Sequence, residues 1–139
     1  MKTEYFLRID PFDMHPHIVT AERDAEGSLL DMFYRECKCD TIDVVYTRWT
    51  FGDQQIIMVC DDNALINGLQ CFNALATMIY CSRSQIFGPV IVGLKGEYDG
   101  ETDVVGFDYQ TDAEFAAIMI RHLLTGADED PLEWDIRND

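Results

Sequence analysis

Apolar and polar residues alternate along several short runs of the chain, and a period of two predicts β-strands. The first run is Thr3 to Ile9, in which Tyr5, Leu7 and Ile9 alternate with Glu4, Phe6 and Arg8. Asp10-Pro11 ends it. A strand at the edge of a sheet exposes unpaired backbone groups, so we consider a homodimer formed by pairing of this strand with a second copy.

The centre of the chain is the richest in β-formers. Thr41 to Phe51 and Gln55 to Cys60 are dense in Ile, Val, Tyr and Trp, and Gly52-Asp53 between them is a turn signal. The pattern predicts an antiparallel hairpin. Both faces of its first strand carry large apolar residues, which indicates a central strand covered on both sides.

A second hairpin is predicted further along the chain. Pro89 to Leu94 and Asp103 to Phe107 are short apolar strands, and the polar stretch Lys95 to Thr102 between them is interpreted as a solvated loop. The stretch from Phe12 to Gly27 has no clear period and is interpreted as a connection with at most a short helical turn.

Three segments have helical spacing. Ser28 is a suitable N-cap for a helix through about Glu36, and Cys71 to Tyr80 is a second helix. Thr111 and Glu114 form a capping box that opens the third, and Gly126 is placed to end it. The predicted apolar face of the second helix is Phe72, Leu75, Met78 and Ile79, and that of the third is Phe115, Ile118, Met119, His122 and Leu123.

These elements predict an α+β fold, a mostly antiparallel sheet of about five strands with about three helices on one face. A chain of 139 residues, 47% of them hydrophobic, is long and apolar enough for one folded domain. We assign it to residues 1–127, and 128–139 to an acidic C-terminal tail anchored by Trp134. The N-terminus lacks a signal-peptide pattern and no apolar run is long enough to span a membrane, so we expect a cytoplasmic protein.

Acidic residues are concentrated in the C-terminal third. From Gly96 to Asp139 the chain has thirteen acids and two bases, within a formal net charge of −16. Charge of this size repels nucleic acid and anionic membranes, and it attracts basic protein surfaces or cations. The five cysteines are an odd number in a chain without an export signal, which favours free thiols in a reducing compartment.

The middle of the chain resembles a family. The run from Ile56 to Tyr80, followed by the strand at Gly88, has a hydrophobic strand ending in an acidic pair, then a glycine, an asparagine opening an alanine-containing helix, and a glycine before another strand. The matching positions are Asp61, Asp62, Gly68, Asn73, Ala74, Ala76 and Gly88, and Phe72 stands where a proline is expected. The pattern covers about Ser28 to Phe115 and resembles a small domain of unknown function from bacteria, phages and conjugative elements. The resemblance implies a mobile-element context and no catalytic residues.

Two kinds of reactive site can be considered. His15, His17, Cys37 and Cys39 have the residue types of a four-ligand zinc site, although their spacing is not the usual one, and loop histidines with ordinary thiols explain them equally. A cysteine nucleophile near His122 is the other, but no local motif marks an activated cysteine. We predict no cofactor and no catalytic residue.

Several acidic and polar residues are candidates for binding. Asp61, Asp62 and Asn63 follow a strand, where they also suit a turn. Glu97, Asp99, Glu101 and Asp103 could bind a cation, but neither run has the layout of an EF-hand. Asn73 is interpreted first as a helix N-cap.

Two functions remain open. The first is a non-catalytic interaction protein whose acidic surface binds a basic partner, against the alternative that the charge serves only solubility. The second is a small-molecule-binding or enzymatic domain with a pocket of Tyr46, Trp49, Phe51 and Tyr80 beside Asp61 and Asp62. Those aromatic residues are equally suited to the core. The absence of a convergent His, Ser or Lys motif favours the first function.

Overall fold

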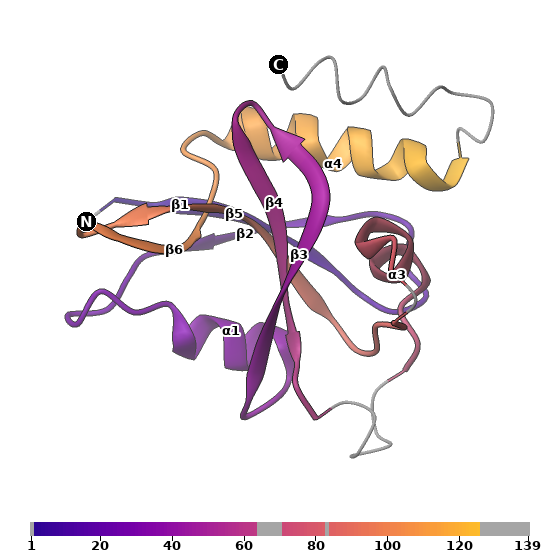
Figure 1. The fold of residues 1–139 in the computed structure, drawn as a ribbon, viewed down its shortest axis with the longest axis horizontal. Helices are drawn as coiled ribbons and strands as arrows, with labels where there is room; N and C mark the ends of the chain where they lie inside the picture. The colour runs from indigo at the N-terminus through magenta and orange to yellow at the C-terminus, as the bar shows by residue number, and fades with distance from the viewer. Residues whose placement is uncertain (1, 64–70, 83, 126–139) are drawn as a thin grey trace.

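The computed structural model describes residues 2–63, 71–82 and 84–125 of the chain (Figure 1). Within them lie six strands and three helices. In chain order these are β1 (Glu4–Ile9), β2 (His17–Ala21), α1 (Leu30–Cys37), β3 (Ile42–Phe51), β4 (Gln54–Asp61), α3 (Ala74–Tyr80), β5 (Val90–Tyr98), β6 (Glu101–Val105) and α4 (Gln110–Thr125). All strand pairs are antiparallel, which confirms the predicted α+β class.

The strands form one sheet in the order β2-β1-β5-β4-β3, with β6 added beside β5. Val92 of β5 pairs with β4 on one side and with β1 on the other. Leu94 pairs with β4 and with β6 in the same way. Therefore β1 and β6 follow one another along the same side of β5, and a bridge between Tyr5 and Phe107 joins them.

Helices cover both faces of this sheet, so the prediction that they share one face is wrong. Met32 and Phe33 of α1 pack with Phe6, Ile57 and Ile91 on one face. Residues of α3 and α4 pack with the alternate strand residues, among them Leu7, Met58 and Val92, on the other face. Figure 1 shows α1 apart from α3 and α4, across the strands. The central strands are apolar on both faces, and each face therefore requires its own cover.

The prediction of a connection over Phe12 to Gly27 is also wrong, because β2 lies within it. All five residues of β2 pair with β1, from Glu4↔Ala21 to Arg8↔His17. The strand lies at the edge of the sheet and buries only Ala21 fully, so its sequence has little apolar alternation. Since β2 and β5 flank β1, the strand that we considered for edge pairing is an interior strand.

The two predicted hairpins are present, and the second is tighter than expected. In the first, Phe51 pairs with Gln54 around Gly52-Asp53, and Gly52 has a positive φ of 64°. In the second, Tyr98 pairs with Glu101 around a two-residue turn of Asp99 and Gly100. Most of the stretch that we interpreted as a loop is therefore strand.

The helices differ from the predictions in their starts and buried faces. The N-cap of α1 is Leu29 and not Ser28, so the predicted N-cap is wrong by one residue. The Oγ of Ser28 still accepts a hydrogen bond from the amide of Leu30, the first residue of the helix. Because α4 begins at Gln110, Thr111 lies inside the helix and the predicted capping box is wrong. Among the described side chains of α4, which do not include the predicted Leu123, Ala113, Ala116, Met119 and Ile120 are buried, whereas Phe115, Ile118 and His122 are exposed.

The buried face predicted for the second helix is also partly wrong. Only Leu75 and Ile79 of its expected face are buried, and Phe72 and Met78 are exposed. Gly126 and the predicted tail lie outside the described residues. None of the described helices combines the length and apolar character that crossing a bilayer requires.

Candidate functional site

A buried arginine organises one end of the sheet. Arg23 follows β2, and its side chain is only 5% exposed. Its Nε donates to Glu4 at 2.9 Å, and its Nη2 donates to Glu4 and to the carbonyl of Val104. Its Nη1 donates to Asp103 at 3.0 Å and to the carbonyl of Gly27. All five guanidinium N–H groups therefore have protein acceptors.

Two glycines and one tyrosine complete this arginine cluster. Glu4 also accepts a hydrogen bond from the amide of Gly106, and a side chain at Gly106 would meet the backbone of Tyr5 at 2.7 Å. The ring of Tyr98 lies 4.0 Å from the Arg23 guanidinium, a cation–π contact. Gly27 has a φ of +78°, and a side chain there would come within 2.8 Å of the Tyr98 ring. Close approach of the Tyr5 backbone therefore excludes a larger residue at Gly106, and the positive φ together with the Tyr98 ring excludes one at Gly27.

A groove of about 320 Å³ lies beside the arginine cluster. Its apolar lining comes from Phe51, Leu94, Val105 and Phe107, and the rings of Phe51 and Phe107 meet edge to face at 5.1 Å. Its polar lining includes Lys2, Glu97, Asp108 and Asp112. Lys2 pairs with Asp108, and this hydrogen bond raises the pKa of the lysine. The volume is at the lower end of the range of about 300–1,000 Å³ for ligand pockets.

A second, more polar hollow lies on the other side of Tyr98. It is lined by Glu26, Asp99, Glu101 and Asp103 together with Tyr98, which also lines the groove. We call these residues together with Glu97, Asp108 and Asp112 the hairpin surface. No described cation forms an ion pair with Glu26, Glu97, Asp99, Glu101 or Asp112. The hairpin surface therefore combines five uncompensated carboxylates with a tyrosine that is 41% exposed.

The four acids predicted as one candidate cation site are separated by the strands that carry them. Glu97 pairs with Thr102, so its side chain is on the face of the hairpin opposite to Glu101 and Asp103. Asp99 lies in the turn with a positive φ of 54°. Asp103 is bound to Arg23. The arrangement presents negative charge to two hollows and does not gather the four carboxylates around one cation.

Asp61, Asp62 and Asn63 form a turn, as one of the two interpretations predicted. Asp61 is buried, and its Oδ1 accepts a hydrogen bond from the Asn63 amide at 2.9 Å. The side-chain amide of Asn63 donates to Thr41. Asp61 and Asp62 share a hollow of about 210 Å³ with Tyr80.

The predicted aromatic pocket does not assemble. Trp49 is buried in the core, and its indole N–H donates to the carbonyl of Ile79 at 3.0 Å. Phe51 lines the groove by the hairpin, and Tyr46 is exposed. Of the four predicted aromatic residues, only Tyr80 lines the hollow of Asp61 and Asp62. Only Trp49 is a buried core residue, as the alternative interpretation of the sequence allowed, because its indole is large and apolar.

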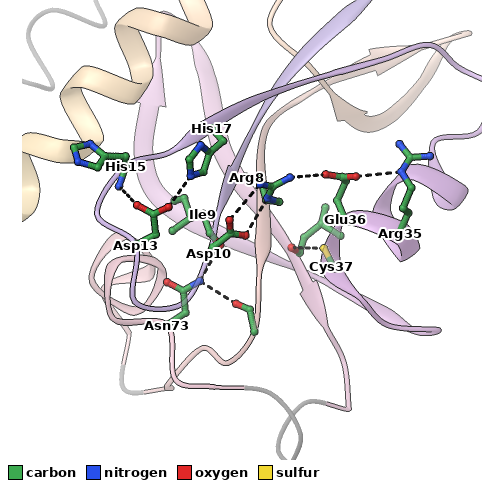
Figure 2. A network of polar contacts seen from close by, with 12 residues as sticks. Arg8, Ile9, Asp10, Asp13, His15, His17, Arg35, Glu36, Cys37 and Asn73 are labelled. Atoms are coloured by element: carbon green, nitrogen blue, oxygen red, sulfur yellow. Dashed lines mark hydrogen bonds and ion pairs between the residues drawn. The ribbon is translucent and has the colours of Figure 1, made fainter.

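Asn73 is the N-cap of α3, as interpreted from the sequence, and it has a further structural role. Its Oδ1 accepts from the amide of Ala76, and its Nδ2 donates to the carbonyls of Ile9 and Gly88 at 3.0 and 2.9 Å. Figure 2 shows this amide reaching the end of β1. The side chain is 1% exposed, so its contacts hold α3 to the sheet and leave no atom for a ligand.

The four residues of the predicted zinc site lie apart. Cys37 is buried and its thiol contacts the carbonyl of Val59, whereas His15 and His17 lie on or beside the loop between β1 and β2 (Figure 2). The ligand atoms of no three of these four residues come together. His17 instead lies beside Asp13 and Asp10, two carboxylates that the sequence analysis did not select.

Three of the five thiols do not have the properties of nucleophiles. Burial raises the pKa of Cys60 to about 12, and burial likewise raises the pKa values of Cys37 and Cys39. A raised pKa keeps a thiol protonated at neutral pH, and the thiolate is the reactive form. Cys71 and Cys81 are exposed.

The sequence analysis missed most residues of the site. Arg23, Glu4 and Tyr98 come from three distant segments, and the only local signal was an acid at the start of a mostly apolar strand. Asp108 and Asp112 were counted as part of the acidic third of the chain but were not assigned a place. Their proximity to Lys2 and Phe51 depends on the pairing of β5 with β1 and β6 on one side and with β4, which pairs with β3, on the other.

The comparisons with known proteins agree with the resemblance in the middle of the chain and extend it. Residues 1–112 match a family with the description "Domain of unknown function (DUF3846)". The match begins before the first residue of the resembling pattern and includes β1, β2 and β6. No curated protein and no solved structure matches the chain. With most of its length covered by this match, the chain belongs to the DUF3846 family of domains of unknown function.

Proposed function

We propose that this domain is a non-catalytic interaction module that binds a basic partner protein through the hairpin surface. The observation that supports the proposal is the position of five uncompensated carboxylates around an exposed tyrosine and an apolar groove. Lysine and arginine have long apolar stems and charged ends. Such a side chain would place its stem against Phe51 and Val105 and its charge beside Glu97 or Asp112.

The electrostatics of this surface favour association with a cationic partner. Clustered charge of one sign raises the rate of encounter with the opposite charge, and salt screens it beyond a Debye length of about 8 Å at physiological ionic strength. The outer part of the Tyr98 ring adds a second type of contact, because tyrosine binds cations over its ring and is common at interfaces.

The groups lining the groove support binding better than catalysis. Glu4 and Arg23 are bound to each other, and Lys2 is bound to Asp108. A general acid or base requires a titratable group that is available to exchange a proton with a substrate. Glu97 and Asp112 lie outside these pairs, but no histidine, cysteine or serine is among the described residues that line the groove beside them. The groove therefore offers charge and apolar area without a nucleophile.

The test is affinity purification of the tagged protein from a bacterial lysate at low and high salt, with the bound proteins identified by mass spectrometry. The informative variant is Glu97→Gln/Asp112→Asn, which removes two charges from the groove. The matched control is Asp31→Asn/Asp40→Asn, which removes two exposed charges from α1 and the turn after it. We expect one basic partner that is retained by the control and lost by the groove variant and at high salt.

Two outcomes would contradict the proposal. If both variants lose the partner equally, total charge determines the binding and the hairpin surface has no special role. If wild type retains no partner at low salt, the acidity is better explained by solubility.

A second candidate function is small-molecule binding at the hollow of Asp61, Asp62 and Tyr80. The exposed Asp62 and the partly buried Tyr80 face a volume of about 210 Å³, below the usual range for ligand pockets. Substitution of Asp61 and Asp62 together should abolish binding of any ligand found by screening. Unchanged binding would exclude this site.

Self-association through an edge strand is a separate proposal, which can be tested on the same purified protein. The strands at the ends of the sheet order are β2 and β3, and edge strands offer backbone groups for pairing. Size-exclusion chromatography with light scattering gives the mass, and a monomer at every concentration tested would reject the homodimer.

A further inference from the structure

The loop between β1 and β2 brings three metal-ligating side chains together. Asp10 directly follows β1, Asp13 lies within the loop, and His17 is the first residue of β2. Their ligand atoms all lie within 4.8 Å of one another, and the His17 Nε2 is 2.6 Å from the Asp13 Oδ2. Figure 2 shows the Asp13 carboxylate beside the His17 ring, with Asp10 close to them.

The backbone of the loop holds this arrangement in place. Asp13 Oδ1 accepts a hydrogen bond from the His15 amide at 2.9 Å, and the Asp13 amide donates to the carbonyl of Asp10. Phe12, which lies between Asp10 and Asp13, has a positive φ of 65°. Its side chain is 87% exposed, so burial of the ring does not stabilise this conformation. Backbone strain in a residue with a large side chain is frequent at functional sites.

A second layer of contacts orients Asp10. Arg8 binds both oxygens of the Asp10 carboxylate, at 2.9 and 3.2 Å, and its Nη1 donates to Glu36 at 2.9 Å. Glu36 is in turn bound by Arg35. Supporting contacts of this kind fix the geometry of metal-binding carboxylates.

The charges of this group permit a divalent cation. Asp10, Asp13 and Glu36 carry three negative charges and Arg8 and Arg35 two positive charges, so the group has one net negative charge when His17 is neutral. The side chains of Asp10, Asp13 and His17 are all between 30% and 44% exposed. A metal ion could therefore reach them from solvent and keep water in its other positions.

We propose that Asp10, Asp13 and His17 bind a divalent transition metal ion of the zinc class. An imidazole nitrogen with two carboxylates suits zinc better than magnesium or calcium, which prefer oxygen ligands alone. Ligand atoms on one zinc ion are about 3.4 Å apart, given bonds of about 2.0–2.2 Å. Binding therefore separates the His17–Asp13 pair slightly and draws Asp10 inward, which side-chain rotation can supply.

The site is independent of the proposed function. It lies at the Ile9 end of β1, whereas the hairpin surface adjoins the Glu4 end. Loss of zinc binding would leave the basic partner's interaction in place, and loss of the partner would leave zinc binding in place.

The test is isothermal titration of the full chain with ZnCl₂ at pH 7.5, in a Cys71→Ser/Cys81→Ser background that removes the exposed thiols. We expect one equivalent of zinc, no heat from MgCl₂, and a shift of the His17 ring resonances in NMR spectra. Asp13→Asn and His17→Gln should each weaken zinc binding by about tenfold or more, on the scale of changes at metal sites.

The control variant is His15→Gln, which changes an exposed neighbour whose backbone amide, not its ring, supports Asp13. It should bind zinc with affinity within about twofold of the parent. Circular dichroism without metal checks that each variant is folded. Two results would overturn the proposal: the parent binds no stoichiometric zinc, or Asp13→Asn and His17→Gln bind zinc as well as the parent does. The His17–Asp13 hydrogen bond would then serve only to close the loop.

Discussion

An arginine bound to carboxylates lies at each end of β1, and the two clusters differ in what they leave available for a ligand. At the Glu4 end, Arg23 is 5% exposed and uses every N–H group on protein acceptors. At the Asp10 end, Arg8 is 31% exposed, and the neighbouring Asp13 and His17 face solvent. The same residue types therefore make a saturated cluster at one end of the strand and an open one at the other.

The difference teaches how burial separates structural from binding roles. A buried arginine with all its donors satisfied joins β1, β6 and the loop at Gly27, and it has nothing left to offer a ligand. Its contribution to binding is indirect, because it positions Tyr98 between the groove and the acidic hollow. Half-exposed carboxylates and an imidazole retain lone pairs and can exchange their partners with solvent.

The largest expected effect tests the saturated cluster. Arg23→Met should lower the free energy of unfolding by about 3–5 kcal/mol, because it leaves the buried Glu4 carboxylate without its counterion. Urea denaturation followed by circular dichroism measures the change. The double variant Glu4→Met/Arg23→Met should recover part of the loss, since it removes both buried charges. A loss below about 1 kcal/mol for Arg23→Met, the scale of exposed pairs, would refute the contrast between the two clusters.

An intermediate effect is expected at Asn73, which ties α3 to the Asp10 end of β1. Asn73→Ala should destabilise the fold by about 2–3 kcal/mol, because the helix loses its N-cap and two buried carbonyls lose a donor. Asn73→Ser keeps a capping oxygen but cannot reach Ile9 and Gly88. Its free energy of unfolding should lie between those of wild type and the alanine variant, and equality with wild type would show that the two carbonyl contacts contribute nothing.

The smallest effect is expected at the open cluster. Arg8→Met should cost about 1 kcal/mol or less at pH 7, because its pairs are partly solvated. The pH dependence is more informative. Burial acts to raise the pKa of Glu36, but hydrogen bonds from Arg8 and Arg35 outweigh burial and hold the pKa below its ordinary value of 4.5.

A carboxyl group with a depressed pKa in the folded state stabilises the fold above its unfolded pKa, and this stabilisation is lost as the pH falls through the folded value. Wild type should therefore lose stability below about pH 4.5 more steeply than Arg8→Met, in which the depression of the Glu36 pKa is weakened. Urea midpoints at pH 7, 5, 4 and 3 measure both profiles. Parallel profiles would show that Arg8 does not control the ionisation of Glu36.

Features that depend on a few neighbouring residues were predicted well from the sequence. The hairpin around Gly52-Asp53, the turn at Asp61 to Asn63 and the cap at Asn73 are all present. Each follows from the conformational preference of one or two residues, such as the positive φ of Gly52 or the capping oxygen of Asn73. The family resemblance rests on the same segment.

Features that depend on packing were predicted less well. In α4 the larger residues Phe115 and Ile118 suggested the buried face, but the sheet contacts Ala113 and Ala116, whose small side chains allow the helix to lie close. Edge strand β2 has too few apolar positions to be found by periodicity. The predicted aromatic pocket was also wrong, because the size and apolarity of a side chain do not distinguish a ligand site from the core.

The sequence by itself determined most of the local elements of this protein, its α+β class and its acidity, because these follow from composition and from residues that are neighbours in the chain. Only the tertiary structure decided that helices cover both faces, that Arg23 meets Glu4 and Asp103, and that His17 meets Asp10 and Asp13 rather than the cysteines. The physical reason is that β-sheet pairing joins segments far apart in sequence. The register of β1 with β2 and β5, which no local pattern specifies, places these side chains.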